Sequence, residues 1–355
     1  MKTWQRLRSQ PHLWDRYFIR ENILWAIRNF FRTKKFHEVE TPLLTGSLLP
    51  ESYLDVFETT LLDRNRVPTR AFLPTSPEVF LKKLLVAGIG NCFSLTKSFR
   101  NTEDKSNTHM PEFTILEWYR VNADYTDIMR DCEELIGFLN TSLHHPGPYR
   151  KQRRPSSSLV YQGKTIDLSL PWERMSVSKA FRTYAGVELE RTLTRSSLLR
   201  VAQRKGYRVG VNTTWEELFH LIFLNEVEPK LGRGKPTILY DYPVSLAALS
   251  RKKKSDPRFA ERFEFYIEGL ELGDAYSELT DWKEQRVRFK KEQRLRRQLG
   301  KIDHPTDTDF IDALKTGMPP AGGIAVGVDR LVMLLSDTAD INDTLLFPTG
   351  DLFSR

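Results

Sequence analysis

Cysteine is scarce in this chain, which has only Cys92 and Cys132 among its 355 residues. The two stand far apart, and neither belongs to a CxxC pair. Disulfide-stabilised domains and cysteine zinc sites need more cysteines at closer spacing. The sequence therefore indicates neither of these, and it fits a reducing compartment.

Long apolar runs are missing as well. No uncharged stretch is long enough to cross a bilayer. The N-terminus, MKTWQRLRSQPHLWDRYFIREN, is charged throughout and lacks the apolar core of a signal peptide. We therefore expect a cytoplasmic protein that does not associate with membranes.

Apolar residues are nevertheless plentiful. Hydrophobic residue types make up 40% of the chain, so it can bury a large core as one big domain or two moderate ones. The net charge is +8. This charge favours an anionic partner such as nucleic acid, a nucleotide or an acidic protein, but it says nothing about the fold.

Hydrophobic periodicity predicts an alternation of helices and strands. Helices are expected over 14–34, 78–90, 126–143, 194–206, 214–227 and 281–301. Strands are expected over 36–45, 92–100, 111–119, 235–243 and 262–272, and 322–335 reads as strand, tight turn and helix. Segment 146–158 is rich in proline, serine and basic residues, so an exposed excursion and then a hairpin around Gln162 and Gly163 are expected at about 146–172. This pattern predicts an α+β fold on a largely antiparallel sheet.

The strand PEFTILEWY, residues 111–119, carries the first candidate site. A period of two places Phe113, Ile115, Glu117 and Tyr119 on one face, a mixture typical of neither core nor solvent. One interpretation is a half-buried strand in which Glu117 pairs with a nearby arginine. The other is a binding site, because Arg100 ends the partner strand and a guanidinium suits a phosphate or a carboxylate.

Three glutamates form the second candidate site. Glu264, Glu271 and Glu278 lie within a segment whose aromatic residues and glycines favour two strands over a helix. Carboxylates gathered on a sheet face either bind Mg²⁺ or hold an ammonium group, and both uses remain open.

The third candidate is GGIAVGVDRLVMLL, residues 322–335. Its glycines leave room for a ligand, and a helix that begins near Val328 presents a positive end to an anion. Arg330 in the first helical turn opposes the helix dipole, so it needs an acidic partner or a phosphate.

Together these segments resemble a known family. TPLLTGSLLPE with Pro42, the pair SFRN and HMPEFTILEWYR, and GVDRLVML are similar to motifs 1, 2 and 3 of class II aminoacyl-tRNA synthetases, in this order. The lysyl branch is resembled in detail, by TSPE at 75–78, EFxxxExY at 112–119, IDLxxPW at 166–172, RFEF at 262–265 and ELGDAYSELTD at 271–281. The resemblance runs from about residue 14 to 348 and implies one catalytic domain over 1–355.

Within this branch the chain resembles the stand-alone paralogues that modify elongation factor P. Only 41 residues precede Pro42 (42 minus 1), so we expect no anticodon-binding domain ahead of the core. Ala325 fits the paralogues, because lysyl-tRNA synthetases have glycine there. One added methyl in a tight pocket discriminates between substrates by roughly 1–3 kcal/mol.

The resemblance implies an ATP-dependent, AMP-forming ligase. It would activate (R)-β-lysine, or lysine, as an adenylate and transfer it to a lysine side chain of elongation factor P, an acidic protein. ATP and Mg²⁺ would be required, and tRNA is not an expected partner. A homodimer is implied too, with the strand 36–42 at its interface.

The resemblance also implies a role for each matching residue. Glu78 and Glu278 would hold the two ammonium groups of the substrate, and Tyr119 would assist at the side-chain end. Arg100 and Arg330 would be the catalytic residues. The implied amino-acid site is Ser76, Pro77, Glu78, Tyr119, Glu278 and Ala325. The implied ATP site is Arg100, Asn101, Glu103, His109, Phe113 (under the adenine), Glu271, Leu272, Gly327 and Arg330, with Glu264 and Glu271 on Mg²⁺. No nucleophilic side chain is required, because in-line attack on a phosphate needs positioning and charge neutralisation.

Some positions depart from the family pattern. Thr102 stands where a glutamate is usual, with Glu103 next to it, and Met110 replaces an asparagine. Asp274 and Tyr276 also differ from the usual residues. Two alternatives therefore remain, a truncated lysine-tRNA ligase that charges tRNA, and a non-catalytic relative that senses an amino acid.

Overall fold

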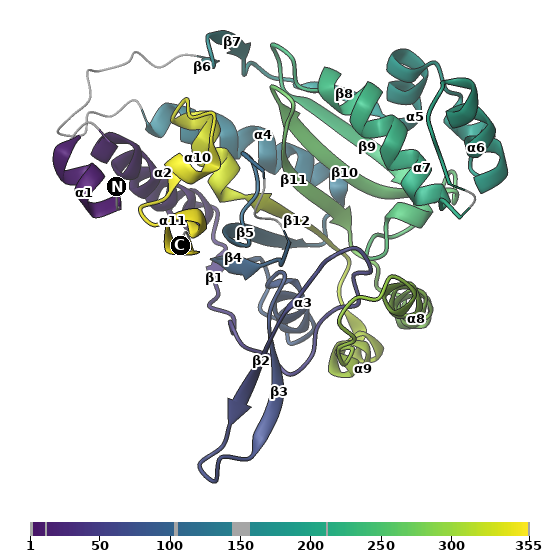
Figure 1. Ribbon diagram of the computed structural model, residues 1–355, viewed down its shortest axis with the longest axis horizontal. Coiled ribbons are helices and arrows are strands. Elements are labelled where there is room, and N and C mark those ends of the chain that lie inside the picture. Colours follow the sequence, from purple (N-terminus) through teal and green to yellow (C-terminus); the bar gives the residue numbers. More distant parts are fainter. Residues whose placement is uncertain (1–2, 11–12, 103–105, 144–156, 211, 354–355) are drawn as a thin grey trace.

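The protein is built around an eight-stranded sheet (Figure 1). The computed structural model describes residues 3–10, 13–102, 106–143, 157–210 and 212–353. The strands run in the order β1 (His37–Glu38), β4 (Cys92–Phe99), β5 (Glu112–Val121), β12 (Ala321–Gly327), β11 (Leu270–Ser277), β10 (Phe259–Ile267), β9 (Thr237–Pro243) and β8 (Glu173–Ser176). Only the two edge pairs, β1 with β4 and β8 with β9, are parallel. The sheet is thus largely antiparallel, and the expected α+β class is confirmed.

Helices on one face of the sheet enclose the main core. They are α2 (Trp14–Thr33), α4 (Tyr125–Ser142) and α10 (Val328–Leu335). Leu116 and Trp118 of β5 belong to this core and are fully buried. Because side chains alternate along a strand, the odd-numbered residues of β5 must point to the opposite face.

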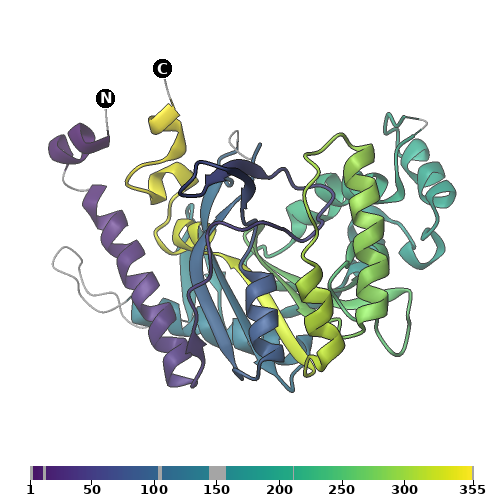
Figure 2. The same cartoon turned by 90° about the horizontal axis from the view of Figure 1, so that it is seen from below.

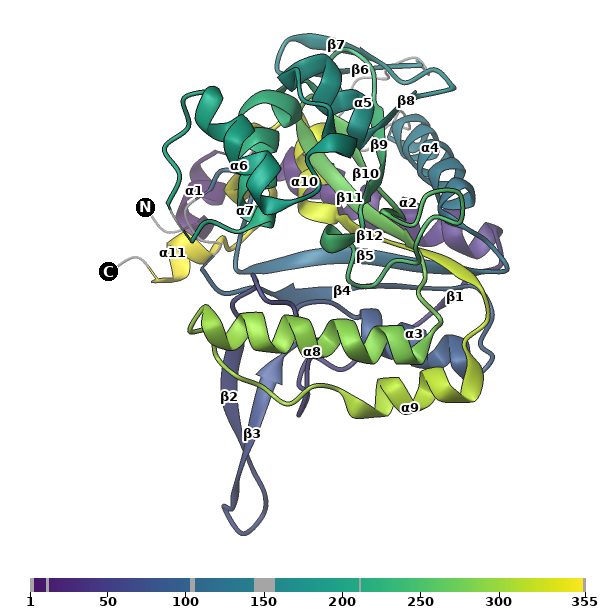
Figure 3. The same ribbon diagram turned by 90° about the vertical axis from the view of Figure 1, so that its right-hand side faces the viewer.

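A second group of helices lies on the other side of the sheet (Figures 2 and 3). It consists of α3 (Glu78–Val86), α8 (Trp282–Gln298) and α9 (Thr308–Gly317). Leu81 of α3, Phe289 of α8 and Phe310 of α9 share a buried cluster with Tyr119 of β5. The odd-numbered face of β5 is therefore partly covered by these helices.

A third cluster lies at the β9 end of the sheet. It contains α5 (Val177–Ala180), α6 (Arg195–Arg204) and α7 (Trp215–Ile222), with the π-helical turns η2 (Phe181–Ala185) and η4 (Phe223–Val227). The short helices are α1 (Thr3–Ser9), α11 (Thr349–Phe353), η3 (Leu189–Arg191), η5 (Glu228–Lys230), η6 (Val244–Leu246) and η7 (Ile341–Thr344).

Two hairpins lie outside the central sheet. One pairs β6 (Ser158–Tyr161) with β7 (Lys164–Asp167) through Gln162 and Gly163, both at positive φ, which suits a tight two-residue turn. The other pairs β2 (Phe57–Leu62) with β3 (Pro68–Leu73) and projects away from the body (Figures 1 and 3). The sequence predicted the first hairpin, whereas the second was not expected.

Local signals explain where several helices begin. Asp124 caps α4, because its carboxylate accepts hydrogen bonds from the backbone N–H groups of Thr126 and Asp127. The Asp127 carboxylate accepts the Asp124 N–H in return, which completes a capping box. Thr214 and Glu217 form the same motif at α7. These caps satisfy N–H groups that would otherwise lack a partner.

Most predicted elements are confirmed, with several differences besides the β2–β3 hairpin. The strand expected over 36–45 contains only His37 and Glu38, and it lies at the sheet edge. The helix α9 was not expected, and most of the excursion, residues 146–156, lies outside the described residues. Both cysteines are buried free thiols, and no described helix is long and apolar enough to cross a membrane.

Candidate active site

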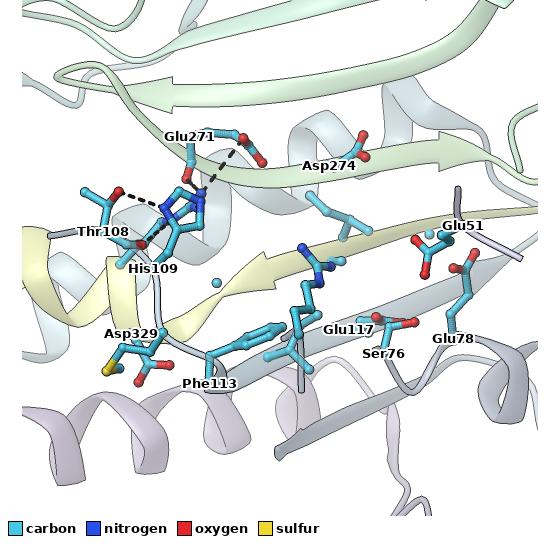
Figure 4. A pocket seen from close by; sticks show the side chains of 18 of the residues that line it. Glu51, Ser76, Glu78, Thr108, His109, Phe113, Glu117, Glu271, Asp274 and Asp329 are labelled. Atoms are coloured by element: carbon cyan, nitrogen blue, oxygen red, sulfur yellow. Dashed lines mark hydrogen bonds and ion pairs between the residues drawn. The ribbon is translucent and has the colours of Figure 1, made fainter. Parts of the chain in front are cut away.

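A cavity of about 240 Å³ opens on the odd-numbered face of β5 (Figure 4). Its β5 wall is Phe113, Ile115, Glu117 and Tyr119, the four residues that the strand pattern places on one face. Neighbouring strands contribute Gly323, Ala325 and Gly327 of β12, and Glu271, Asp274 and Tyr276 of β11. Three segments that are far apart in the sequence thus meet at one site.

A bulge in β11 sets which of its residues face the cavity. Glu271 pairs with Tyr266 and Gly273 with Phe265, so Leu272 is an extra residue between them. Glu271 and Asp274 consequently both line the cavity, although they are an odd number of residues apart. The Leu272 side chain lies in the main core instead, so any part it has in ATP binding belongs to its backbone.

The two glutamates that were expected to hold the ammonium groups of the substrate meet at one end of the site. Lys82 Nζ contacts Glu78 Oε1 and lies 2.6 Å from Glu278 Oε2. Burial lowers the pKa of Lys82, but the two carboxylates outweigh it and raise the pKa above its ordinary value. The structure therefore brings Glu78 and Glu278 together, but around a lysine of the chain itself.

Glu117 and Tyr119 lie beside this acidic pair. The Tyr119 hydroxyl donates to Glu117 Oε2 over 3.0 Å, and burial together with Glu78 raises the pKa of Glu117 well above its usual range. Among the described residues Glu117 has no arginine within ion-pair distance. The interpretation of Glu117 as a glutamate paired with an arginine was therefore wrong.

Gly323 makes room for these groups. A Cβ built on Gly323 would lie 2.5 Å from Glu278 Oε1 and closer still to the Tyr119 ring. In the sheet Gly323 stands between Tyr119 of β5 and Tyr276 of β11. Only glycine therefore fits at this point of the cavity wall.

Arg100 and Phe113 lie in the middle of the cavity. The Arg100 guanidinium carbon is 5.2 Å from the centre of the Phe113 ring. Its buried Nε has no hydrogen-bond partner, and it forms no ion pair with any residue that the structure describes. The arrangement leaves a cation for an anionic group of a ligand.

Arg330 and His109 form the opposite end. Arg330 donates to the Thr108 carbonyl over 3.1 Å, to the Glu271 carbonyl over 2.8 Å and to His109 Nε2 over 2.6 Å. Burial, Arg330 and Arg100 lower the pKa of His109 to about 4, so its ring is neutral near pH 7 and accepts this hydrogen bond. Arg330 thus has carbonyls and a neutral ring as partners, with the Glu271 carboxylate 3.9 Å away.

The two expected magnesium ligands differ in availability. Glu271 lines the cavity with a side chain that is 39% exposed. Glu264 is buried, and its oxygens accept hydrogen bonds from Arg262, Tyr242 and Tyr266. No cluster of three or more metal-ligating side chains occurs in the described part of the chain.

Magnesium nevertheless fits part of this arrangement. The ion commonly binds one or two carboxylates together with substrate phosphates and water. Glu271 meets that requirement, whereas Glu264 would first have to release its three partners. The role of Glu264 as a metal ligand stays a prediction.

Other expected residues take different positions. Ser76 lines the cavity, and Pro77 is the N-cap residue of α3. Asn101 and Thr102 follow Arg100 in the loop after β4. The Asn101 side chain accepts a hydrogen bond from the Thr102 N–H, and Thr102, at φ 67°, donates a hydrogen bond from its hydroxyl to Asp55. Glu103 lies outside the described residues.

Several cavity residues were not predicted. Glu51 and Asp274, which line the cavity, and Lys82, which pairs with Glu78 and Glu278, had no role assigned from the sequence, whereas the glycines of 322–335 were expected to leave room for a ligand. Lys82 carried a sequence signal, because it follows Glu78 by four residues in a helix and so lies on the same helix face. Glu51 comes from a loop without periodicity, and nothing in the sequence placed it near the other acids.

The fold and the cavity together define the class of this protein. A mostly antiparallel sheet flanked by helices, with arginines that follow β4 and begin α10, is the catalytic domain of a class II aminoacyl-tRNA synthetase. The chain belongs to the family described as tRNA synthetases class II (D, K and N), whose profile matches residues 3–351.

Curated relatives agree with this family. The chain is 35% identical over 340 residues to a lysine–tRNA ligase of Pelotomaculum thermopropionicum, covering 95% of this chain and 64% of that protein. It is 36% identical over 341 residues to the enzyme of the same name from Carboxydothermus hydrogenoformans, covering 95% and 66%. A lysine–tRNA ligase of Moorella thermoacetica is 35% identical over 342 residues, covering 96% and 66%. The chain spans slightly less than two thirds of the length of these relatives.

Proposed function

We propose that this chain activates (R)-β-lysine or lysine with ATP and transfers it to a lysine side chain of elongation factor P. The reaction would form an aminoacyl-adenylate and pyrophosphate, and then an amide with release of AMP. The chain would act as a single catalytic domain.

One observation carries the proposal. Glu78, Tyr119 and the adjoining Glu278 lie at one end of the cavity, His109 and Arg330 lie at the other, and Arg100 lies between them beside the Phe113 ring. Acids at one end suit the ammonium groups of a diamino acid, and the aromatic ring and arginines suit a nucleotide. Both substrates would then meet at Arg100, where the carboxylate attacks the α-phosphate.

Ala325 supports the choice of acceptor. Its methyl group lies in the cavity wall on β12, paired with Glu117 on one side and Asp274 on the other. The resemblance associates alanine at this position with enzymes that modify elongation factor P.

A second candidate function is favoured by the names of the relatives, which are lysine–tRNA ligases. One experiment separates the two. The full chain is incubated with ATP and radiolabelled lysine or (R)-β-lysine, together with either elongation factor P or bulk tRNA. We expect label on elongation factor P, and label that appears only on tRNA would reject this proposal in favour of the second candidate.

A third candidate, a non-catalytic amino-acid sensor, is motivated by Thr102 and Met110. Pyrophosphate exchange tests it without any acceptor. We expect ATP to be labelled from pyrophosphate when either lysine isomer is present, because adenylate formation is reversible. No exchange with both isomers, despite ATP binding, would favour the sensor.

A further inference from the structure

Glu51 is a cavity carboxylate that forms no ion pair with any residue that the structure describes. Its carboxylate and that of Glu78 lie at the same end of the cavity, which is the acidic end (Figure 4). In the described residues its only hydrogen-bond partner is the Thr75 hydroxyl, 2.9 Å from Oε2. Burial raises the pKa of Glu51, Arg100 lowers it, and Glu78 raises it further.

The neighbouring acids differ from Glu51 in this respect. Glu78 and Glu278 share Lys82, so one of their two negative charges is already balanced. Glu278 is 2% exposed, and apart from this ion pair neither of its carboxylate oxygens accepts a hydrogen bond from a described residue. The acidic end therefore holds more carboxyl groups than the described cations of the protein pair with.

Glu51 and Arg100 are close enough to influence one another, yet they form no ion pair in the described structure. Arg100 likewise has no other carboxylate partner among those residues. An unpaired anion and an unpaired cation, held apart on one cavity wall, are complementary to the ammonium and carboxylate of an amino acid.

The protein fixes Glu51 from behind. Arg296 of α8 is 1% exposed and donates to the Glu51 carbonyl over 2.8 Å and to the Leu54 carbonyl over 2.6 Å. Glu292 of the same helix accepts the Ser52 hydroxyl over 2.6 Å. A loop held in this way keeps its side chain in position before the ligand arrives, which a binding group requires.

We propose that Glu51 binds the amino group nearest to the reacting carboxylate, and that it makes the site selective for amino acids that carry this group. This inference rests on the proposed function. It assigns the near amino group to Glu51 beside Glu78, the carboxylate to Arg100, and the distant amino group to the region of Glu117, Tyr119 and Glu278.

A ligand that lacks the near amino group isolates this contact. 6-Aminohexanoate keeps the carboxylate and the distant amino group of lysine, and has no other amino group. The full chain and its variants Glu51→Gln and Glu51→Asp are titrated with lysine, (R)-β-lysine and 6-aminohexanoate. The matched control is Glu58→Gln. Glu58 is an exposed glutamate of β2, the strand that follows the loop with Glu51.

We expect Glu51→Gln to weaken the binding of at least one lysine isomer by about 10- to 100-fold, as for a lost charged hydrogen bond. Binding of 6-aminohexanoate should change less than about twofold. The preference for that lysine isomer over 6-aminohexanoate should therefore fall by nearly as much as the binding of the isomer itself. Glu51→Asp should recover part of it, and Glu58→Gln should resemble the wild type. ATP affinity, unchanged in all variants, reports an intact fold.

This role would be overturned if Glu51→Gln left the ratio of lysine affinity to 6-aminohexanoate affinity unchanged for both isomers. That holds whether the binding of all ligands weakens equally or the binding of none changes. The proposed function fails in a different way, through a wild type that binds ATP but supports pyrophosphate exchange with neither lysine isomer. Wild-type exchange that survives Glu51→Gln with the same KM would reject only the role of Glu51.

Discussion

At the scale of single residues, Gly323 fixes the shape of the cavity. Gly323→Ala would place a methyl group 2.5 Å from Glu278 Oε1 and against the Tyr119 ring. We expect amino-acid activation to fall by about 100-fold or more, because the ammonium-binding groups must move. Overpacking should also cost about 1–3 kcal/mol of unfolding free energy. Pyrophosphate exchange and thermal unfolding measure the two effects.

Gly137 provides the control for that substitution. It is exposed in α4, and a Cβ there meets nothing within 4 Å. Gly137→Ala should leave exchange unchanged and stabilise the protein by about 0.5–1 kcal/mol. Full activity in Gly323→Ala would show that the described cavity is not where the amino acid binds.

The pH dependence of amino-acid binding should report Glu278. Burial raises the pKa of Glu278 to about 7, against the opposing effect of Lys82. Only the ionised carboxylate attracts an ammonium group, so lysine affinity should decrease as the pH falls from 8 to 6. Below the pKa the dissociation constant should rise up to about tenfold per pH unit.

Calorimetry in two buffers of different ionisation enthalpy checks this prediction. Lysine binding at pH 7 should release a proton from the wild type. Glu278→Gln should bind lysine more weakly, release less than the wild type and show a flatter pH profile. A wild-type affinity that stays constant from pH 6 to 8 would contradict the assignment of this pKa to the site.

The residues of the site were predictable only in part. Strand periodicity alone predicts the shared face of Phe113, Glu117 and Tyr119, because side chains alternate along a strand. It could not predict the bulge at Leu272, which turns that side chain into the core although the resemblance implied a place for Leu272 in the ATP site. It gave no information on Glu51, whose position depends on Arg296, far away in the sequence.

At the scale of elements, α8 anchors the loop before β2. Arg296 also donates to the Ile302 carbonyl over 2.9 Å, so one buried guanidinium serves three carbonyls. Arg296→Met should lower the unfolding free energy by about 3 kcal/mol, because buried carbonyls lose charged donors. It should also raise the KM for lysine, because Glu51 loses its support.

The adjacent Arg297 is the matched control. Its partner is Asp303 at 3.1 Å, and both side chains are at least half exposed. Arg297→Met should change the unfolding free energy by less than about 0.5 kcal/mol and leave the KM unaltered. Equal effects of the two substitutions in denaturant unfolding would argue against α8 as the anchor.

Elements with a strong periodic pattern were predicted well. The amphipathic pattern over residues 14–34 became α2, and the alternation in 92–119 became the β4–β5 hairpin. The β2–β3 hairpin was missed, because most of its residues are exposed and only its base, at Ala71 and Phe72, is buried, so the sequence shows no alternating buried face. Helix α9 was missed although its buried side chains, Phe310, Ile311 and Leu314, repeat at helical spacing.

At the scale of the whole molecule, the family resemblance predicted contacts between distant segments, which periodicity could not predict. The order of β5, β11 and β12 in the sheet unites segments from three parts of the chain. Local patterns do not contain such long-range pairing, so only the resemblance predicted that these segments meet. The approach of Tyr119 and Glu278 follows from this topology, and α3 brings Glu78 to them through Lys82.

Self-association is the prediction at this scale. A groove of about 740 Å³ runs between α2, β4 and the C-terminal segment, near the strand implied as the dimer interface. Trp25 of α2 lines it with 66% of its surface exposed, and so does Phe347 with 59%. Large apolar side chains exposed together mark an interaction surface, and we expect a second copy of this chain to cover them.

Trp25→Glu tests this expectation. Sedimentation of the wild type should give a mass near twice 41.4 kDa, and the variant should shift toward 41.4 kDa, because a charge would be buried without a partner. Val287 of α8 is equally exposed at 66%, on a helix that is not part of the groove. Val287→Glu should therefore remain dimeric, and a wild type that sediments only as a monomer would refute the dimer.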